Sequence, residues 1–393
     1  MPSIHVARKG CLVKVRNPIL IALVSSVLSL FLQPSPAWAR KGKEASFRVG
    51  FLYPRTGRLA PYGQSLSEGV KLALSQFREE NPKLGAEVSV IVADDGGLAS
   101  LAEKAAERLI TTQKAHVLIG SLSNIVNQSL SAVSTKNRTL LLLPRSTDEG
   151  QLGTSLTFTL SPTDRRQGRM MAAYTSRQLR RERAAIIFDT RSPDAEAIAK
   201  GFSEGFTQAG GTIVGQWSFD SRRPNIDRLF EEVAKAQPDI VVHPGSYRGL
   251  QALVEGARKY GLKGPWLGSD GWDHEALVTL NPSLGTHYFF SYFHPSDPQP
   301  GVQNFVYAYE TTYGKKPDAL AAAGFESMRV LLQAYALAKS SDTQALLKAL
   351  EQARLAGMYS GRFSSDHVFL RPSPFLVTAN QQIRFMSRVA LDD

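Results

Sequence analysis

The chain has 393 residues, of which 43% are hydrophobic and 21% charged, so it is neither a disordered nor a fibrous protein and has room for two or three domains. Its formal net charge of +11 includes four basic residues near the N-terminus and three more within 40–43, which leaves the rest of the chain only mildly basic. The arginine cluster at 177–183 is typical of a solvated helix face, and we do not expect a nucleic-acid partner.

Residues 1–39 have the organisation of a secretory signal. Basic residues precede the apolar run PILIALVSSVLSLFL, and small residues follow it at Ala37 and Ala39. The run is shorter than the roughly 20 residues that a membrane-spanning helix needs, which favours a cleaved signal over a retained anchor. We therefore expect cleavage after Ala39, a periplasmic location and no membrane insertion of the mature chain.

The single cysteine, Cys11, lies before the apolar run, whereas a lipid anchor would need one just after it. The mature chain then contains no cysteine, so it forms no disulfide and has no thiol chemistry. A large exported protein of this composition fits an oxidising compartment such as a bacterial periplasm.

From residue 46 onward, short β-rich runs alternate with longer runs whose apolar residues recur at helical spacing. The first series predicts strands at 46–53, 87–95, 116–120 and 139–143, and helices at 63–80, 101–113 and 124–136. Strands as continuously apolar as TLLLL, separated by helices, are typical of a parallel sheet that is covered on both faces.

A second series of the same kind follows the segment LTFTLSPTD. It predicts strands at 184–189, 212–219, 239–243, 265–268 and 286–293, and helices at 167–181, 193–210, 225–236 and 248–261. Two long helices, at 305–314 and 321–339, and two β-like segments, at 360–365 and 374–386, complete the chain. No short-period repeat is present, so a solenoid or propeller is not expected.

These patterns predict an α/β protein with two doubly wound parallel-sheet lobes joined by a three-crossing hinge. The expected organisation is a signal over 1–39, a basic linker over 40–45, a first lobe over 46–161 and 293–358, and a second lobe over 162–292 and 359–393. A hinge of this kind lets two lobes close on a molecule that binds between them.

Several predicted strands run directly into polar residues, where each next helix or turn begins. These residues are Ser123 and Asn124, Arg145, Ser146 and Thr147, Tyr247, and Asp270. Any one of them can simply cap the next helix. As a group they lie where ligands of parallel sheets bind, beyond the carboxyl ends of the strands.

The types of these residues suit a zwitterion such as an amino acid. Hydroxyl and amide groups at helix N-termini, as at Ser123, Ser146 and Thr147, can hold a carboxylate, and Asp270 can pair with an ammonium group. Arg145 leaves two alternatives open, because it either selects an acidic ligand or pairs with Asp148 on the surface.

No pattern in the sequence indicates catalysis, a cofactor or a metal site. The chain lacks G-x-S-x-G, H-E-x-x-H and both phosphate-loop patterns, and its histidines show no metal-ligand spacing. We expect His243, at a strand end, to be buried or close to the hinge. The pairs Asp94–Asp95 and Asp270–Asp273 are typical of turns. We therefore expect a protein that is not an enzyme.

The segment TGRLAPYG, followed by GVKLAL, resembles the opening of the type I periplasmic binding proteins, particularly the leucine/isoleucine/valine-binding branch that serves ABC transporters. The resemblance continues in order over residues 46–390, through VIVADD, VLIGSLSN, LLLPRST, AAIIFD, DIVVHPGSY, GARKYGL, WLGSDG and YGKKPDALAAAGFES. The chain departs from this family after AAIIFD, where Arg191, Ser192 and Pro193 stand in a region that commonly has a tyrosine, and at Arg145, which replaces a small residue.

The resemblance implies a monomeric solute-binding protein that delivers an amino acid or a related compound to an ABC transporter permease. It places the ligand's carboxylate at Ser123, Asn124, Ser146 and Thr147, its ammonium group at Asp270, and an aromatic contact at Tyr62, although this tyrosine can also pack on its own loop. With Arg145 from the first lobe and Tyr247 from the second, these residues are the expected ligand site. The opening segment also resembles penicillin-binding-protein activators, which act through protein contact in cell-wall synthesis, and this alternative stays open.

Overall fold

The computed structural model describes residues 46–151, 156–222, 226–262, 264–280 and 286–391. The predicted signal and basic linker lie outside the described residues. All the elements below belong to one compact unit that begins at Ala45. Within the described ranges, no helix combines the length and the apolar character that crossing a membrane requires.

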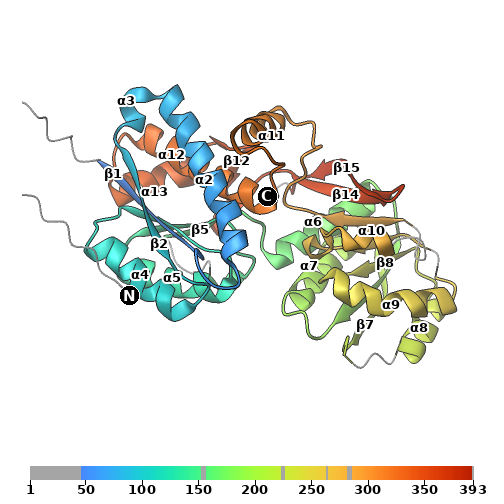
Figure 1. Cartoon of the computed structure of the whole chain (residues 1–393). Coiled ribbons are helices and arrows are strands. Elements are labelled where there is room, and N and C mark those ends of the chain that lie inside the picture. The colour runs from blue at the N-terminus through green and yellow to red at the C-terminus, as the bar shows by residue number, and fades with distance from the viewer. Residues whose placement is uncertain (1–45, 152–155, 223–225, 263, 281–285, 392–393) are drawn as a thin grey trace, which may run out of the picture. The chain divides into compact units, whose positions relative to one another are not determined.

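Five parallel strands form the first sheet, in the order β2-β1-β3-β4-β5 (Figure 1). Their bounds are β1 (Phe47–Tyr53), β2 (Val88–Asp94), β3 (Val117–Ile119), β4 (Leu140–Leu143) and β5 (Thr157–Thr159). Because β1 pairs with both β2 and β3, the direction of winding reverses between β1 and β3. Open α/β sheets bind their ligands at such a switch point.

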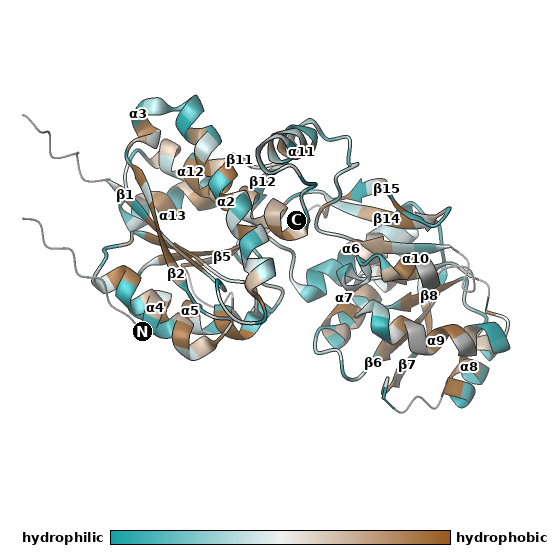
Figure 2. Ribbon diagram, viewed as in Figure 1, coloured by the Kyte–Doolittle hydropathy of each residue, from teal (hydrophilic) through white to brown (hydrophobic). Residues whose placement is uncertain are grey.

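Strand β4 shows why the first sheet needs so apolar a sequence. All four of its leucines are 0% exposed, and successive side chains point to opposite faces of the sheet. Leu140 and Leu142 join the core beneath α2 (Ala60–Glu80) and α12 (Ala319–Ala338), whereas the other two leucines join the core beneath α4 (Ala99–Thr111) and α5 (Asn124–Lys136). The prediction of a strand buried on both faces is confirmed, and Figure 2 shows the strands of this sheet largely in the hydrophobic colour.

The second sheet has seven strands in the order β15-β14-β10-β9-β8-β6-β7. They are β6 (Arg183–Asp189), β7 (Thr212–Phe219), β8 (Ile240–His243), β9 (Trp266–Gly268), β10 (His287–Phe290), β14 (Ser373–Ala379) and β15 (Gln382–Val389). The strands from β6 to β10 are parallel, and their winding reverses between β6 and β8, as it does between β1 and β3 in the first sheet. β14 runs antiparallel to both of its neighbours, β10 and β15.

Helices cover both faces of the second sheet and form two cores with it. One core contains residues of α6 (Asp164–Arg177) and α7 (Ala195–Gln208), and the other contains residues of α8 (Ile226–Lys235) and α9 (Tyr247–Lys259). A short 3₁₀ turn, η2 (Asp270–Trp272), and helix α10 (Ala276–Leu280) follow β9. The fold is therefore the predicted pair of doubly wound lobes.

Glycines let two pairs of helices approach each other closely. A Cβ atom on Gly69 of α2 would lie 1.9 Å from the carbonyl oxygen of Ala321 in α12. In the same way, a Cβ atom on Gly168 of α6 would lie 2.1 Å from the carbonyl oxygen of Ile198 in α7. Such distances are far below any van der Waals contact, so side chains at these positions would push the helices apart.

The chain passes between the two sheets three times: after β5, after β10, and before β14. After β10 it returns to the first core, where α11 (Pro300–Tyr313), α12 and α13 (Thr343–Gln352) pack. Short elements complete this lobe, namely α3 (Pro82–Gly85), η1 (Glu149–Gln151), β11 (Leu355–Ala356), β12 (Ser360–Phe363) and β13 (Phe369–Leu370).

The third passage lies later in the chain than the expected boundary at residue 359. The predicted β segment 360–365 packs on the first core, where the rings of Phe363 and Phe158 meet edge to face with centroids 4.9 Å apart. Val368 also forms a parallel bridge with Thr159, next to β5. The chain joins the second sheet only at Ser373, because the aromatic residues of 359–369 are buried in the first lobe.

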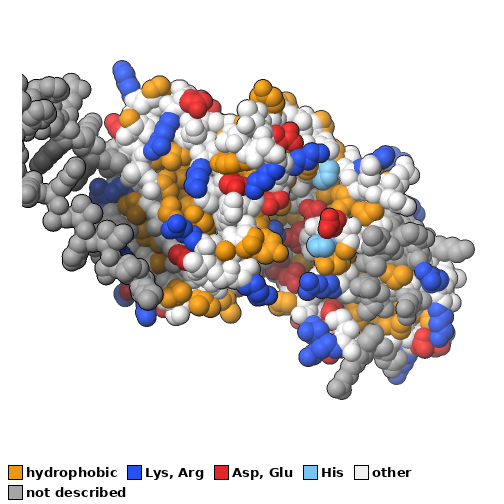
Figure 3. All heavy atoms as spheres, in the orientation of Figure 1, with side chains coloured by type: hydrophobic (Ala, Val, Ile, Leu, Met, Phe, Trp, Pro, Cys, Tyr) orange, Lys and Arg blue, Asp and Glu red, His pale blue; other side chains and the backbone are white. Residues whose placement is uncertain are grey.

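On the face shown in Figure 3, basic and acidic side chains are interspersed, with no broad surface of one sign. Surface charges of both signs, as in the pair Lys259–Asp227 at 2.8 Å, are typical of a soluble domain surface.

Candidate functional site

A cavity of about 440 Å³ lies at the switch point of the first sheet, beyond the carboxyl ends of β1, β3 and β4. It is lined by Leu59, Tyr62, Leu122, Ser123, Asn124, Arg145, Thr147 and Leu320. Five of the eight predicted ligand-binding residues are therefore gathered around one cavity. The three leucines were not among the predicted residues, and they give the cavity an apolar wall.

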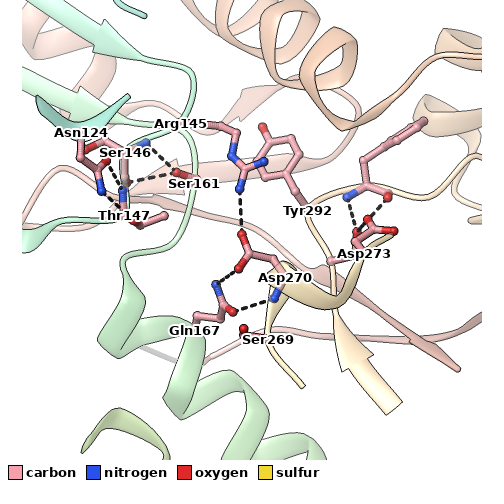
Figure 4. A network of polar contacts seen from close by, with 12 residues as sticks. Asn124, Arg145, Ser146, Thr147, Ser161, Gln167, Ser269, Asp270, Asp273 and Tyr292 are labelled. Carbon is pink, nitrogen blue, oxygen red and sulfur yellow. Dashed lines mark hydrogen bonds and ion pairs between the residues drawn. The ribbon is translucent and has the colours of Figure 1, made fainter. Parts of the chain in front are cut away.

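The polar residues of the cavity are held by bonds between neighbouring strand ends (Figure 4). Asn124 donates from Nδ2 to Thr147 Oγ1 at 3.2 Å and accepts the backbone N–H of Thr147 at 3.4 Å. Ser123 caps helix α5, because its hydroxyl oxygen accepts the N–H of Val126 at 3.3 Å. A hydroxyl that accepts one bond can still donate another, so the capping role is compatible with a ligand contact.

Asn127 sets the position of the Arg145 backbone and was not predicted from the sequence. Its side chain is fully buried, accepts the N–H of Ser121 at 3.0 Å and donates to the carbonyl of Arg145 at 2.8 Å. One amide thus joins the loop after β3 to the loop after β4. A buried amide satisfied at both ends fixes the relative geometry of the groups it links.

Arg145 and Asp270 join the two lobes directly. Arg145 Nη2 lies 2.7 Å from Asp270 Oδ2, with the side chains 30% and 19% exposed, and Figure 4 shows the pair between the strand ends. Of the two alternatives left open for Arg145, the surface pairing with Asp148 is not formed, because Arg145 pairs with Asp270. Asp148 instead accepts the backbone N–H of Gly150 within its own turn, at 2.9 Å.

Gln167, on the first turns of α6, orients Asp270. It donates from Nε2 to Asp270 Oδ1 at 3.2 Å, and its Oε1 accepts the backbone N–H of Asp270 at 3.0 Å. Gln167 is 1% exposed, so this two-point contact is fixed by packing. The carboxylate of Asp270 therefore has one oxygen held within its own lobe and the other directed at Arg145.

The loop that leads to Leu59 and to the first turn of α2, where Tyr62 lies, is organised by Asp94. Its carboxylate accepts the Thr56 hydroxyl at 2.7 Å and the backbone N–H groups of Arg55 and Gly96 at 2.8 and 2.9 Å. Burial alone would raise the pKa of Asp94, but these hydrogen bonds outweigh it and hold the pKa below its usual value. The acidic pair predicted to serve a turn does so here through Asp94.

Three predicted site residues do not line the cavity: Asp270, which pairs with Arg145, and Ser146 and Tyr247. Ser146 is 1% exposed, and its backbone N–H donates to Ser161 Oγ at 3.0 Å beneath the surface. Tyr247 begins helix α9, and its ring stacks on His274 with centroids 4.1 Å apart. The rule that polar residues follow strand ends places their backbones correctly but does not fix where their side chains point.

A second cavity, of about 300 Å³, shares Tyr62 and Leu320 with the first, so the two adjoin. Its lining includes Asp273 of the second lobe, whose carboxylate accepts the Ser291 hydroxyl at 2.6 Å. Burial raises the pKa of Asp273, and the nearby charge of Asp270 raises it further. Asp273 thus places a carboxyl group of the second lobe in the cavity that adjoins the apolar wall, three residues after Asp270.

Another carboxyl group of this region, Asp164, begins helix α6 next to Gln167. Burial, with the charges of Asp194 and Asp270, raises its pKa to about 8. A carboxyl group in this state is largely protonated at neutral pH and can donate a hydrogen bond. Asp164 was not singled out from the sequence, because its burial depends on how the two lobes pack.

The histidine predicted to be buried, His243, is 0% exposed, with Nδ1 2.7 Å from the carbonyl oxygen of Ile187. Burial lowers its pKa to about 4, so it is neutral at ordinary pH. Across the described ranges, no group of three or more His, Cys, Asp or Glu side chains is arranged to hold a metal ion.

The two lobes wind in the same way, the chain crosses between them three times, and a cavity lies at a switch point. These features together define a two-lobed α/β binding protein. The sequence model of the family described as "Periplasmic binding protein" matches residues 46–381, and the chain belongs to this family. It is a family of binding proteins rather than a class of enzymes.

Named relatives lie in the branched-chain amino acid group. A Leu/Ile/Val-binding protein of Rhizobium johnstonii is 21% identical over 312 residues, covering 79% of this chain and 80% of that protein. A leucine-binding protein of Thermotoga maritima has the same fold, with a TM-score of 0.69 and 23% identity. The match covers 87% of this chain and 98% of that protein. A branched-chain amino acid transporter substrate-binding protein of Streptococcus pneumoniae, in complex with isoleucine, also has this fold, with a TM-score of 0.69 and 23% identity. The match covers 88% of this chain and 100% of that protein.

Proposed function

We propose that the protein is a periplasmic solute-binding protein that takes a small zwitterion with an apolar side chain, of the amino-acid class, and delivers it to the permease of an ABC transporter. One observation carries the proposal: an ion pair between the lobes, Arg145–Asp270, stands beside a cavity with an apolar wall. The names of the relatives, which refer to leucine, isoleucine and valine, support the same solute class.

The charges of the site favour a zwitterion over an acidic ligand. A zwitterion placed between Arg145 and Asp270 pairs its carboxylate with the guanidinium and its ammonium group with the aspartate, so each buried charge keeps an opposite partner. A dianion would leave Asp270 facing a like charge. Donors on Ser123, Asn124 and Thr147 complement the carboxylate, and the leucines with Tyr62 complement an apolar side chain.

Such a ligand would contact both lobes, which is what a binding protein of this type requires. A ligand shifts the balance between lobe arrangements only by the difference in its affinity for them. Contacts to Arg145 in one lobe and Asp270 in the other supply that difference. We expect the mature protein to act as a monomer, because each chain holds a complete site.

The test is a thermal-shift and calorimetric screen of the chain from residue 40 onward. Leucine, isoleucine and valine should stabilise it, by about 2.7 kcal/mol at a hundredfold excess over Kd. Leucinamide, which lacks the carboxylate, and 4-methylpentanoate, which lacks the ammonium group, should bind far more weakly. If no amino acid binds while a cell-wall synthase is retained on the immobilised protein, the role in solute delivery is wrong and the activator role is supported.

A further inference from the structure

A second cavity with a different chemistry lies where the chain crosses between the lobes. It has a volume of about 350 Å³ and shares no lining residue with the cavity at Arg145. Four arginines and no acidic residue are among the described residues that line it, which are Pro162, Arg166, Met170, Arg354, Ser360, Arg362, Phe369, Leu370, Arg371, Pro372, Ser373, Ala390 and Leu391. Below it is called the arginine pocket.

The four arginines come from separate parts of the fold. Arg166 lies on the first turn of α6 in the second lobe. In the first lobe, Arg354 directly precedes β11 of the three-stranded sheet, and Arg362 lies within its strand β12. Arg371 lies on the third crossing. Guanidinium groups therefore approach one concave space from both lobes and from the hinge itself.

One of the four is committed to the hinge. Arg371 Nε lies 3.0 Å from Glu326 Oε2, and its other nitrogens donate to the carbonyls of Pro372 and Tyr292 at 3.0 Å each. Its charge is thereby matched by a buried carboxylate. Arg371 gives the pocket a rigid wall, and three further guanidinium groups line it.

Those three are placed to receive an anion. Arg166 is 6% exposed, and its Nη2 lies 3.8 Å from Asp366 Oδ1. Arg354 and Arg362 are exposed at the rim, where Arg354 donates to the Ser360 hydroxyl at 3.1 Å. An oxyanion in the pocket would meet Arg166 at its base and two guanidinium groups at its opening.

We propose that the arginine pocket is a binding site for a phosphate group, either inorganic phosphate or the phosphate of a small ester. Guanidinium groups donate to phosphate oxygens through paired N–H groups, and a tetrahedral phosphate presents oxygens in every direction, as donors from three elements require. The apolar side chains of Met170, Phe369 and Leu391 leave room for a small organic substituent.

Occupation of this site would act on the hinge. A phosphate bound to Arg166 and to the rim arginines connects α6 of the second lobe with the three-stranded sheet of the first. Arg166 is followed directly by Gln167, which holds Asp270. The site is separate from the proposed solute site, and its existence does not rest on the identity of the solute.

The experiment measures phosphate binding to the full mature chain without any solute. Calorimetry and thermal shift are run with inorganic phosphate and with glycerol 3-phosphate, against sodium chloride at matched ionic strength. The variant Arg354→Gln/Arg362→Gln alters only exposed side chains, so it should fold, and circular dichroism checks this. Arg108→Gln/Arg138→Gln removes two exposed positive charges elsewhere on the same lobe and is the matched control.

We expect at least one of the two phosphates to stabilise the wild-type protein beyond the chloride control. The rim variant should weaken its binding at least tenfold, while the control variant should retain it. Binding of glycerol 3-phosphate alone would identify an ester as the ligand, and equal binding of both would identify the phosphate group itself. Absence of binding to the wild-type protein, or equal losses in the two variants, would overturn the proposal.

Discussion

Arg371 and Glu326 form a buried ion pair at the crossings between the lobes, with Arg371 Nε 3.0 Å from Glu326 Oε2 and side chains 1% and 0% exposed. The guanidinium group also lies over the ring of Tyr292, 4.2 Å from its centroid, and of Tyr359, at 4.7 Å. Residues of α12 and of the last two crossings thus meet at one point. The ion pair therefore holds the third crossing, at Arg371, against α12 of the first lobe.

Removing one partner of this pair should cost far more than removing both. Arg371→Met leaves the carboxylate of Glu326 buried without its cation, and we expect a loss of about 3–5 kcal/mol in the free energy of unfolding. The double variant Arg371→Met/Glu326→Gln removes both charges and should recover a large part of that loss. Urea denaturation gives the free energy of unfolding of the wild-type protein and both variants. A double variant that is less stable than Arg371→Met would contradict the role of the pair.

Asn127 should be more important for stability than its position on a helix suggests. Asn127→Leu leaves the N–H of Ser121 and the carbonyl of Arg145 without their partner, at a cost of about 1–3 kcal/mol for each buried group. Gln128→Leu, at the adjacent exposed position of α5, is the matched control and should change stability little. If the proposed solute is bound, Asn127→Leu should also lower its affinity, because the Arg145 backbone is no longer held.

The strand ends could be predicted from the sequence, and the residues that hold them could not. A run such as TLLLL marks a strand buried on both faces, and parallel strands bring their carboxyl ends to one edge, so Ser123, Asn124, Arg145 and Thr147 were placed together. Gln167 lies near the start of a helix, and no local pattern marks it as a site residue. Its contact with Asp270 exists only because α6 and η2 meet in the folded lobe.

The same limit explains where the structure places residues differently from the sequence-based expectation. Residue 247 follows a strand as expected, yet the ring of Tyr247 stacks on His274, since pattern gives the backbone position and not the side-chain direction. Segment 360–365 was expected in the second lobe because it is β-rich and precedes β14. Its lobe is decided by Phe363, which packs on Phe158 more than 200 residues earlier in the chain.

The ion pair between the lobes should have a measurable but small energy in the absence of solute. Its side chains are partly exposed, and pairs of this kind contribute about 1 kcal/mol or less. A double-mutant cycle with Arg145→Met, Asp270→Asn and the double variant measures the coupling by urea denaturation. With a bound zwitterion, each single variant should instead weaken binding more than tenfold, because each removes the partner of one buried ligand charge.

Asp164 should make stability depend on pH in the direction opposite to most carboxyl groups. Its pKa is about 8 in the folded protein against an ordinary value of 3.8, so the folded state binds the proton more tightly than the unfolded state between these values. Stability is therefore lost as the pH rises from about 4 to about 8, by up to about 1.4 kcal/mol per pH unit, and the loss levels off above that.

The neutral variant Asp164→Asn removes this penalty. It should be more stable than the wild-type protein by more than about 1 kcal/mol at pH 8, with the difference shrinking as the pH falls toward 4. Urea denaturation over this range measures the difference. A difference that stays constant with pH would show that Asp164 ionises normally in the folded protein.

Tyr62 should control how strongly the site distinguishes apolar side chains. Its ring is 55% exposed and borders both adjoining cavities, where it can cover an apolar ligand. Affinity should rise from alanine to valine to leucine, by about 0.8 kcal/mol for each buried CH₂ group, and Tyr62→Ala should flatten this series. Tyr307→Ala removes an equally large ring that is 75% exposed on α11, and it should leave the series unchanged. Calorimetry with the three amino acids decides the matter: a series equally steep in Tyr62→Ala would place the apolar contact on the leucines alone.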